Sequence, residues 1–293
     1  MDRMQIIDVE RNDRILRRGD RVAESPVTVP RIKGALRRAT TARDVEKVLN
    51  ENDLFEINWL TIGLLRARAV ARIGGADRAT AFLVSPSLLL TNNHVLPHRR
   101  AAKRSVAYFN DELDENGLDK APVPFPLEPA RFFLTDKALD FTLVGVPAEA
   151  AAQFGYCPLI TKQGKTDVGD AVTIIQHPNG NKKQIAFRAN RVTEILENHI
   201  RYETDTLGGS SGSPVFNDQW QAIALHHHSV ARKDKDGHDL KRDGSPASDD
   251  TPADEIDWAM NQGVRVSRIV AAARAAELDQ EFAKLRDELI EQP

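Results

Sequence analysis

The chain has 293 residues and a net charge of −3, with 40 Lys and Arg against 43 Asp and Glu. This length allows one large domain or two small ones, and the charge gives no general attraction to nucleic acid or to an anionic membrane. The single cysteine, Cys157, excludes an internal disulfide and is typical of a reducing compartment. The charged N-terminus has no apolar signal core, and no apolar run approaches the ~20 residues of a membrane span. We therefore expect a soluble, cytoplasmic protein that binds neither nucleic acid nor membrane.

The N-terminal part differs in pattern from the rest of the chain. Residues 1–30 are rich in Arg and Asp and carry no clear periodicity. Thr40 can cap a helix, because apolar residues at helical spacing follow it, and a second amphipathic stretch runs from Ile57 to Val70. We predict that residues 1–65 form an N-terminal extension with helices, which either braces the rest of the protein or docks a regulatory partner.

Short apolar runs separated by Pro, Gly and Asn follow from Ala81 onward, which is typical of an all-β barrel fold. The predicted strands lie within residues 81–96, 139–144, 168–178, 185–187, 192–196, 200–203, 221–226 and 263–266. Residues 231–256 are rich in Asp, Lys, Gly and Pro, which predicts a mobile surface loop. Ser267 is expected to cap one long helix that continues towards Leu289.

A serine surrounded by glycines is the most informative feature of the sequence. The segment from Gly208 to Pro214 reads GGSSGSP and stands just before an apolar strand. Its glycines allow a sharp turn and let a substrate approach the main chain. The backbone amides of Gly209 and Ser211 can then point to one spot, where an oxyanion would form. By itself, the segment is equally typical of an ordinary turn.

Two residues elsewhere in the chain supply what a nucleophilic serine needs. A free serine is a poor nucleophile near neutral pH, so Ser211 requires a general base, and His94 follows a pair of apolar strands. A buried carboxylate such as Asp140, at the head of another apolar strand, would fix the tautomer of that imidazole and stabilise its cation. A lone histidine or aspartate is usually structural, but the ordered set of His94, Asp140 and Ser211 favours a catalytic triad.

Three motifs in this order, TNNHV, LDFTLV and GSSGSPVF, resemble those of trypsin/chymotrypsin-fold serine peptidases, most closely the bacterial branch near the glutamyl endopeptidases. The resemblance covers roughly residues 66–275. It implies a mainly β fold of two six-stranded antiparallel barrels, with residues 66–293 as the peptidase domain and its C-terminal helix. It also implies a serine endopeptidase that cleaves proteins or peptides through an acyl-enzyme on Ser211, with His94 as base, Asp140 as orienting carboxylate and no cofactor.

The chain departs from this family at the residue before the nucleophile. Trypsin-type zymogens have an aspartate there, which pairs with a newly exposed N-terminal ammonium, whereas this chain has the uncharged Ser210. The stretch Arg72–Gly75 superficially resembles an activation cleavage site, but we interpret it as an ordinary loop because the acidic partner is missing. We therefore expect local backbone bonds, rather than a cleaved terminus, to orient the Gly209 amide.

The residues at the expected specificity pocket give conflicting indications of the preferred substrate side chain. Asp205 stands where trypsin-like enzymes hold the aspartate that binds Arg or Lys. Thr206 and His226 stand where glutamyl endopeptidases bind an acidic side chain, and Asp205 and His226 could instead satisfy each other. An aspartate at the pocket floor would repel a substrate carboxylate, which favours a basic residue before the scissile bond and leaves the acidic alternative open.

Consecutive histidines at 226–228 also raise the possibility of a metal site, because residues 226 and 228 would share one face of a strand. No fourth ligand and no usual Cys/His spacing accompany them, so we expect no metal. His177 and His199 are interpreted as turn or surface residues rather than as ligands.

A catalytically silent module that binds a protein partner through the same cleft is the alternative function. An intact set of His94, Asp140 and Ser211 argues against it, because a binding module needs none of the three. Esterase activity is a third possibility that the chemistry permits, although this fold rarely serves it.

Overall fold

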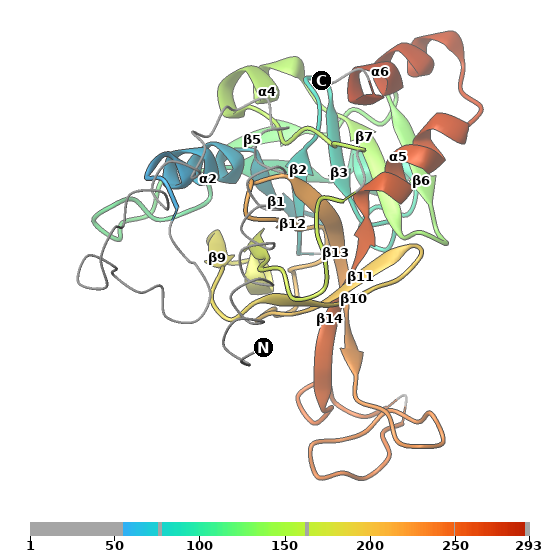
Figure 1. Ribbon diagram of the computed structural model, residues 1–293. Coiled ribbons are helices and arrows are strands. Elements are labelled where there is room, and N and C mark those ends of the chain that lie inside the picture. Colours follow the sequence, from blue (N-terminus) through green and yellow to red (C-terminus); the bar gives the residue numbers. More distant parts are fainter. Residues whose placement is uncertain (1–54, 76–77, 162–163, 249, 291–293) are drawn as a thin grey trace, which may run out of the picture. The chain divides into compact units, whose positions relative to one another are not determined.

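The computed structural model describes residues 55–75, 78–161, 164–248 and 250–290 (Figure 1). The chain divides into two compact units, residues 1–62 and residues 63–292. Both β-sheets belong to the second unit. The helix expected after Thr40 lies outside the described residues, whereas the second amphipathic stretch forms helix α2, Asn58–Arg68.

Seven antiparallel strands form the first sheet, in the order β5-β4-β1-β2-β3-β7-β6 (Figure 1). Their bounds are β1 Val70–Gly74, β2 Ala79–Leu83, β3 Leu88–Thr91, β4 Val106–Phe109, β5 Val123–Pro126, β6 Phe133–Asp136 and β7 Phe141–Gly145. Every residue of β2, β3 and β7 is buried. Strands that are covered on both faces need no polar side, which explains why these three are apolar apart from one buried threonine each.

The second sheet also has seven antiparallel strands, in the order β10-β11-β14-β13-β12-β8-β9. Their bounds are β8 Thr173–Gln176, β9 Gln184–Ala186, β10 Arg191–Ile195, β11 His199–Glu203, β12 Pro214–Phe216, β13 Ala222–Ala231 and β14 Trp258–Arg265. In β11, burial alternates so that Ile200 and Tyr202 face inward, as expected for a half-buried strand. They join a hydrophobic core made with Val172, Ile174, Val192, Val215, Ile223 and Ala224.

These sheets confirm the expected chymotrypsin-like double barrel, although each sheet has seven strands where six were expected. The sequence did not reveal β4, β5 and β6. Each has four residues, which is too short for a periodic pattern to stand out. β5 and β6 are edge strands that pair with β4 and β7 respectively, and β4 also pairs with the more distant β1.

The expectation that Arg72–Gly75 forms a loop is wrong. Arg72, Ile73 and Gly74 belong to β1, which lies between β4 and β2 in the sheet. Ile73 is 1% exposed. A central strand with a buried isoleucine is a structural element, so this stretch is not an exposed site for activation cleavage.

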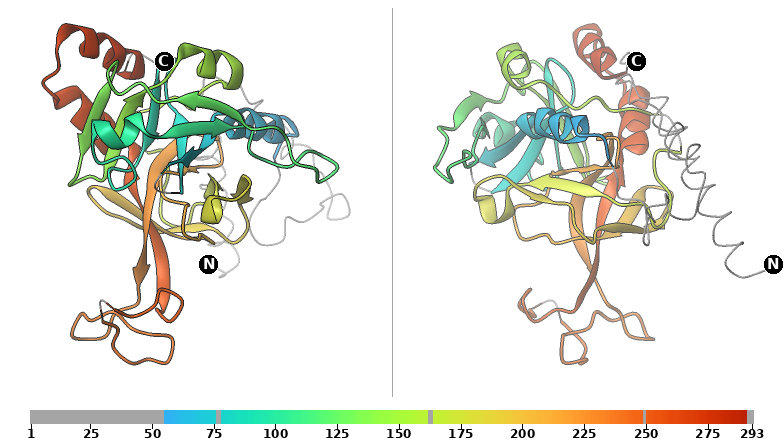
Figure 2. Two further views of the ribbon diagram at one scale, coloured as in Figure 1. Left: turned by 180° about the vertical axis from the view of Figure 1, so that it is seen from behind. Right: turned by 60° about the vertical axis from the view of Figure 1, so that its left-hand side comes forward.

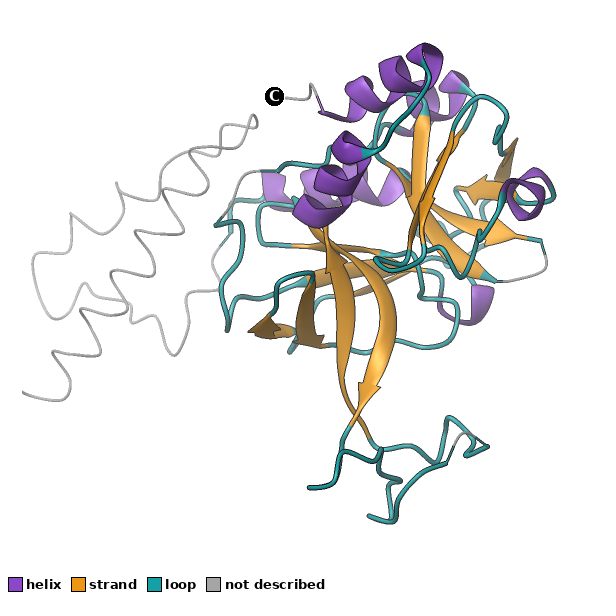
Figure 3. Cartoon of the chain, turned by 90° about the vertical axis from the view of Figure 1, so that its right-hand side faces the viewer, coloured by secondary structure: helices purple, strands orange, loops and turns teal. Residues whose placement is uncertain are grey.

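The remaining helices are α3 Arg99–Lys103, α4 Ala148–Phe154, the 3-10 turn η2 Pro178–Gly180, α5 Val266–Ala275 and α6 Gln280–Ile290 (Figure 3). The expectation of a single long helix from Ser267 is therefore wrong, because the chain forms two helices there, α5 and α6. Asp279 begins the second helix: its Oδ1 accepts a hydrogen bond from the Phe282 amide at 2.9 Å, which is an N-cap contact. None of the described helices is long and apolar enough to cross a membrane.

Strands β13 and β14 form a hairpin arm that extends past the other strands of their sheet (Figure 2). Residues 231–256, expected to be a mobile loop, make up most of its tip. Isolated β-bridges join Lys233 to Asp239 and Lys241 to Ile256 across this tip. The segment is therefore a set of hydrogen-bonded turns rather than a loop without internal pairing.

Candidate active site

Neighbouring strands of the first sheet bring His94 and Asp140 together. His94 lies in the turn after β3, and Asp140 ends the turn before β7. The two strands pair with Thr91 opposite Thr142, so the turns at their ends lie side by side. The side chain of Asn92 donates a hydrogen bond to the Asp140 carbonyl at 2.9 Å, which links the two turns directly.

The carboxylate of Asp140 accepts two hydrogen bonds from His94. The backbone amide of His94 donates to Oδ1 at 3.0 Å, and its ring Nδ1 lies 2.8 Å from Oδ2. Because a carboxylate accepts, Nδ1 carries the proton and Nε2 is left as the basic nitrogen. The His94 side chain is 49% exposed, so Nε2 is placed where it can reach a substrate.

The environment of Asp140 favours its ionised form. Burial raises the pKa of this carboxyl, but hydrogen bonds from His227 and His94 outweigh that effect and hold the pKa well below its ordinary value. Asp140 also adopts a left-handed backbone conformation, with φ of 51°. Such a conformation is uncommon for a residue other than glycine, and it occurs more often at functional sites.

Two glycines shape the loop that carries Ser211. Gly209 and Gly212 have φ of 89° and 88°, a region that side chains rarely adopt. A Cβ atom on Gly212 would collide with the Thr80 carbonyl of β2. Thr80 also clamps the loop from the first barrel, because its amide donates to the Ser211 carbonyl and its Oγ1 donates to the Gly209 carbonyl, both at 2.9 Å.

The hydroxyl of Ser211 donates a hydrogen bond to the backbone carbonyl of His227, with 3.4 Å between the oxygens. Within the described residues it makes no hydrogen bond with His94. Catalytic contacts are often long or poorly aligned without substrate, and a serine hydroxyl is redirected by rotation about one bond. The structure therefore connects Ser211 to the Asp140–His94 pair through His227, and the described residues contain no hydrogen bond between Ser211 and His94.

The backbone amides of Gly209 and Ser211 are the two donors expected at an oxyanion site. Among the described residues, neither N–H donates to a protein acceptor. Of the other amides in the loop, that of Ser210 donates to the Leu207 carbonyl and that of Gly212 donates to the His226 carbonyl. Two unpaired donors next to a serine hydroxyl are the arrangement expected of an oxyanion hole.

A turn of the second barrel orients the first of these donors. The amide of Asn179, in η2, donates to the Gly208 carbonyl. Because a peptide unit is planar, fixing this carbonyl also fixes the direction of the Gly209 N–H. Asn179 has φ of 55°, and it follows His177, which is fully buried. Burial lowers the pKa of His177 to about 4, so this histidine stays uncharged at neutral pH. Of the two expected placements, turn or surface, His177 has the first: it directly precedes the η2 turn and is buried.

Within the described residues, the hydrogen bonds of Ser210 are all local. Its side chain is fully buried, and its Oγ accepts a hydrogen bond from the Leu207 amide at 3.2 Å. An N-terminal ammonium would meet no charge at this position. Uncharged contacts hold the conformation of the loop instead, including the hydrogen bonds from Thr80 to Gly209 and Ser211.

The three residues expected at the specificity pocket lie in different environments. Asp205 is exposed, and Thr206 donates to Asn261 Oδ1 at 2.8 Å. His226 is 3% exposed, and its Nδ1 lies 2.8 Å from the Tyr202 hydroxyl. Burial lowers the pKa of His226 to about 3. Within the described part of the chain, Asp205 and His226 make no hydrogen bond or ion pair with each other, so they do not satisfy one another.

The sequence did not reveal the role of His227. Its Nδ1 lies 3.2 Å from Asp140 Oδ2, and it comes from β13 of the second barrel. The register of β13 against β14 shifts between His226 and His228, so these two residues do not follow the simple alternation that was expected. Among the described residues, no group of three or more His, Cys, Asp or Glu side chains could hold a metal ion.

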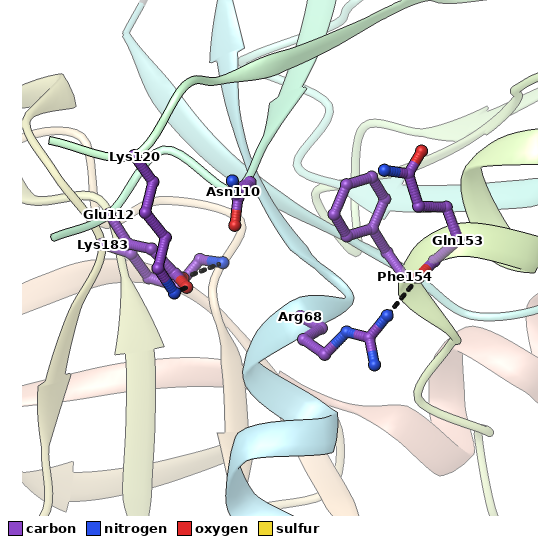
Figure 4. A pocket seen from close by; sticks show the side chains of 7 residues that line it. All are labelled: Arg68, Asn110, Glu112, Lys120, Gln153, Phe154 and Lys183. Carbon is purple, nitrogen blue, oxygen red and sulfur yellow. Dashed lines mark hydrogen bonds and ion pairs between the residues drawn. The ribbon is translucent and has the colours of Figure 1, made fainter. Parts of the chain in front are cut away.

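A cavity of about 300 Å³ lies away from this site (Figure 4). It is lined by Arg68, Asn110, Glu112, Lys120, Gln153, Phe154 and Lys183. Its charged groups already have partners: Glu112 binds Lys120 and Lys183, and Arg68 donates to the Gln153 carbonyl. None of the cavity residues belongs to the candidate active site, so we assign it no part in the chemistry.

Comparisons with known proteins identify the family of the chain. Residues 79–225 match the sequence profile of the family described as trypsin-like peptidase domain. An uncharacterized protein of Sinorhizobium fredii, y4fB, is 37% identical over 255 residues, which cover 77% of this chain and 38% of that protein. The glutamyl endopeptidase of Staphylococcus epidermidis is 24% identical over 167 residues, covering 55% of this chain and 57% of that protein. The chain thus spans from about two fifths to about three fifths of the length of these relatives.

Solved structures show the same fold. The active form of the Rv3671c protease from M. tuberculosis has a TM-score of 0.50 and 13% identity, covering 79% of this chain and 96% of that chain. The serine endoprotease from Yersinia pestis has a TM-score of 0.50 and 13% identity, covering 81% of this chain and 69% of that chain. At these identities, the likeness concerns the fold alone.

Proposed function

The chain belongs to the family of trypsin-like serine peptidases, and we propose that it is an endopeptidase that hydrolyses peptide bonds through an acyl-enzyme on Ser211. The observation that carries the proposal is the convergence of the two barrels on one place. The first barrel supplies the Asp140–His94 pair, and the second supplies Ser211 with two unpaired amides. His227 touches both sides, because its ring binds Asp140 and its carbonyl accepts from Ser211.

In the proposed reaction, His94 acts as general base and then as general acid. Its Nε2 takes the proton of Ser211 as Oγ attacks the substrate carbonyl, and the imidazolium returns that proton to the leaving amine. Water then attacks the acyl-enzyme by the same route. Asp140 remains ionised throughout and stabilises the imidazolium, for which its lowered pKa suits it. No cofactor enters these steps.

The negative charge of the tetrahedral intermediate would fall on the Gly209 and Ser211 amides. Donors of this kind are effective because they are already oriented before the charge develops. Losing one typically costs about 3 kcal/mol of transition-state stabilisation. The contact between Asn179 and Gly208 supports this role, since it holds the peptide unit that carries the Gly209 donor.

We also propose that the oxyanion site forms without cleavage of the chain. Ser210 makes a local hydrogen bond where zymogens place a charged aspartate, and a buried ammonium at this position would be left unpaired. The clamp by Thr80 and the contact from Asn179 supply the orientation instead. Control of activity would then act through access to the cleft rather than through a new terminus.

We assign substrate preference to Asp205, Thr206 and His226. These residues flank the Ser211 loop, and Asn261 ties the Thr206 hydroxyl to β13 by accepting from Ser229 Oγ as well. The exposed carboxylate of Asp205 favours a basic side chain before the scissile bond. A preference for an acidic side chain, governed by His226, is the alternative outcome.

A fluorophosphonate probe tests the proposed function. Active serine hydrolases react with such a probe at the nucleophile, so the protein should be labelled and Ser211→Ala should not. Ser213→Ala is a matched control, because the Ser213 hydroxyl is buried and has no hydrogen-bond partner among the described residues. An unlabelled wild-type protein that still binds a protein partner would support the silent binding module and refute the enzyme.

Two further expectations stay predictions. One is the cytoplasmic location of the protein. The other is the docking of a regulatory partner by the N-terminal helices, of which the one expected after Thr40 falls outside the described residues.

A further inference from the structure

We propose that His227 is a positioning residue, a second histidine that holds the Asp140 carboxylate from the opposite barrel while His94 acts as the base. This inference rests on the proposed serine peptidase function and adds a residue to its machinery. It starts from one oxygen atom: Asp140 Oδ2 lies 2.8 Å from His94 Nδ1 and 3.2 Å from His227 Nδ1.

A chain of side chains behind His227 determines which nitrogen carries its proton. Arg201 Nε lies 3.0 Å from Gln262 Oε1, and Arg201 Nη1 forms an ion pair with Glu194 at 2.7 Å. A guanidinium only donates, so the Gln262 atom that faces it must be the carbonyl oxygen. The amide nitrogen of Gln262 therefore faces His227.

That orientation sets the histidine tautomer. Gln262 Nε2 lies 3.1 Å from His227 Nε2, and an amide nitrogen donates, so this ring nitrogen must accept. A neutral imidazole that accepts at Nε2 carries its proton at Nδ1. His227 Nδ1 therefore donates to Asp140. His228 Nδ1 also lies 3.1 Å from His227 Nδ1. It can accept from the same His227 N–H when the proton of His228 is on its Nε2.

The same contacts exclude His227 as the catalytic base. Both of its ring nitrogens are engaged, one with Gln262 and the other with Asp140, and its contact with Ser211 is through the backbone carbonyl. The ring is 12% exposed and stacks on His199, with the centroids 5.3 Å apart. The ring of His227 therefore acts on the reaction through Asp140, whereas its backbone carbonyl, which any residue at this position would supply, contacts Ser211.

Its role follows from the geometry of the carboxylate. Asp140 sits in a strained backbone conformation at the end of a turn, where a rotation of its side chain would misalign His94. A second donor from the other barrel restrains that rotation and ties the two halves of the site together. Such a residue should affect the chemical step more than substrate binding.

Paired variants test this inference. His227→Leu removes the donor, whereas His227→Asn keeps an N–H close to the position of Nδ1. We expect His227→Leu to lower kcat by about tenfold or more, with KM within about twofold, and His227→Asn to recover most of that loss. His238→Leu, on the hairpin arm, is the control for losing a histidine and should behave as wild type.

A nuclear magnetic resonance measurement keeps the inference testable if both variants unfold. In the intact protein labelled with ¹⁵N-histidine, the ring of His227, assigned by its contact with the Gln262 side-chain amide, should carry its proton on Nδ1. A proton on Nε2 would overturn the inference, and so would equal kcat values for wild type, His227→Leu and His227→Asn. If the wild-type protein itself fails to react with a fluorophosphonate, the proposed function fails instead, which is a separate result.

Discussion

Thr80 is the residue whose replacement most directly tests how the Ser211 loop is oriented. It is fully buried in β2, and its Oγ1 takes part in two hydrogen bonds across the barrels. Oγ1 donates to the Gly209 carbonyl at 2.9 Å and accepts from the His177 amide at 3.0 Å. Thr80→Val has nearly the same shape but removes both bonds, while the backbone bond from Thr80 to Ser211 remains.

The expected effect has two parts. The buried His177 N–H and the Gly209 carbonyl each lose a partner, and each orphaned group costs about 1–3 kcal/mol, so the free energy of unfolding should fall by about 2–6 kcal/mol. The Gly209 peptide also becomes freer to rotate. Losing an oxyanion donor outright costs about a hundredfold in kcat, which is the upper limit expected for Thr80→Val because this residue acts through Gly209.

Urea unfolding and hydrolysis of a small ester measure the two parts separately. Thr80→Ser is the matched control: it keeps Oγ1 and loses one methyl group, which costs about 1 kcal/mol of stability. We expect the serine variant to keep its kcat while the valine variant loses it. If Thr80→Val unfolds at the wild-type urea concentration and hydrolyses the ester at the wild-type rate, the inter-barrel clamp does not orient the loop.

Three further predictions concern the catalytic residues, the pocket and the response to acid. Ser211→Ala and His94→Ala should each abolish measurable peptide hydrolysis, and the double variant should be little worse; multiplicative losses would contradict joint action. Substrate preference can be profiled with a peptide library. If Asp205 binds the substrate side chain, Asp205→Ser should weaken cleavage after Arg or Lys; if His226 does, His226→Ala should lose cleavage after Glu. An unchanged preference in both variants would mean that the pocket is misplaced. Because burial lowers the pKa of His226 from 6.5 to about 3, the unfolded chain binds more protons below pH 6.5, and stability should fall as the pH drops from 6.5 towards 3. In His226→Gln, the urea concentration at the midpoint of unfolding should fall less steeply with decreasing pH than in wild type. An equally steep fall would refute the contribution of His226 to this acid sensitivity.

Local sequence determined the parts of the site that depend on backbone conformation. Glycines at 209 and 212 predict a positive φ, and both residues have one in the structure. Any other residue would be strained there, and at 212 its side chain would also collide with the first barrel. The apolar residues of β3 and β7 predict buried strands, and the turns next to these strands contain His94 and Asp140. These features were predictable because each rests on the chemistry of a few consecutive residues.

Short elements and helix boundaries were harder to predict from the same information. Strand β1 was interpreted partly as a loop, yet it is central because β4 and β2 pair on both of its sides. The break before α6 had a signal in Asp279, a helix-capping residue followed by Gln280 and Glu281, but the apolar pattern on either side concealed it.

Only the tertiary structure determined which residues each of the three consecutive histidines contacts. His226, His227 and His228 are chemically identical in the sequence, but a bulge in β13 gives each a different environment. His226 is buried against Tyr202, His227 binds an Asp140 that lies 87 positions earlier, and His228 is exposed. Contacts over such separations depend on how two barrels meet and on the register of every strand between them. A pattern of neighbouring residues carries no information about that register, so the second donor to Asp140 became visible only in the folded chain.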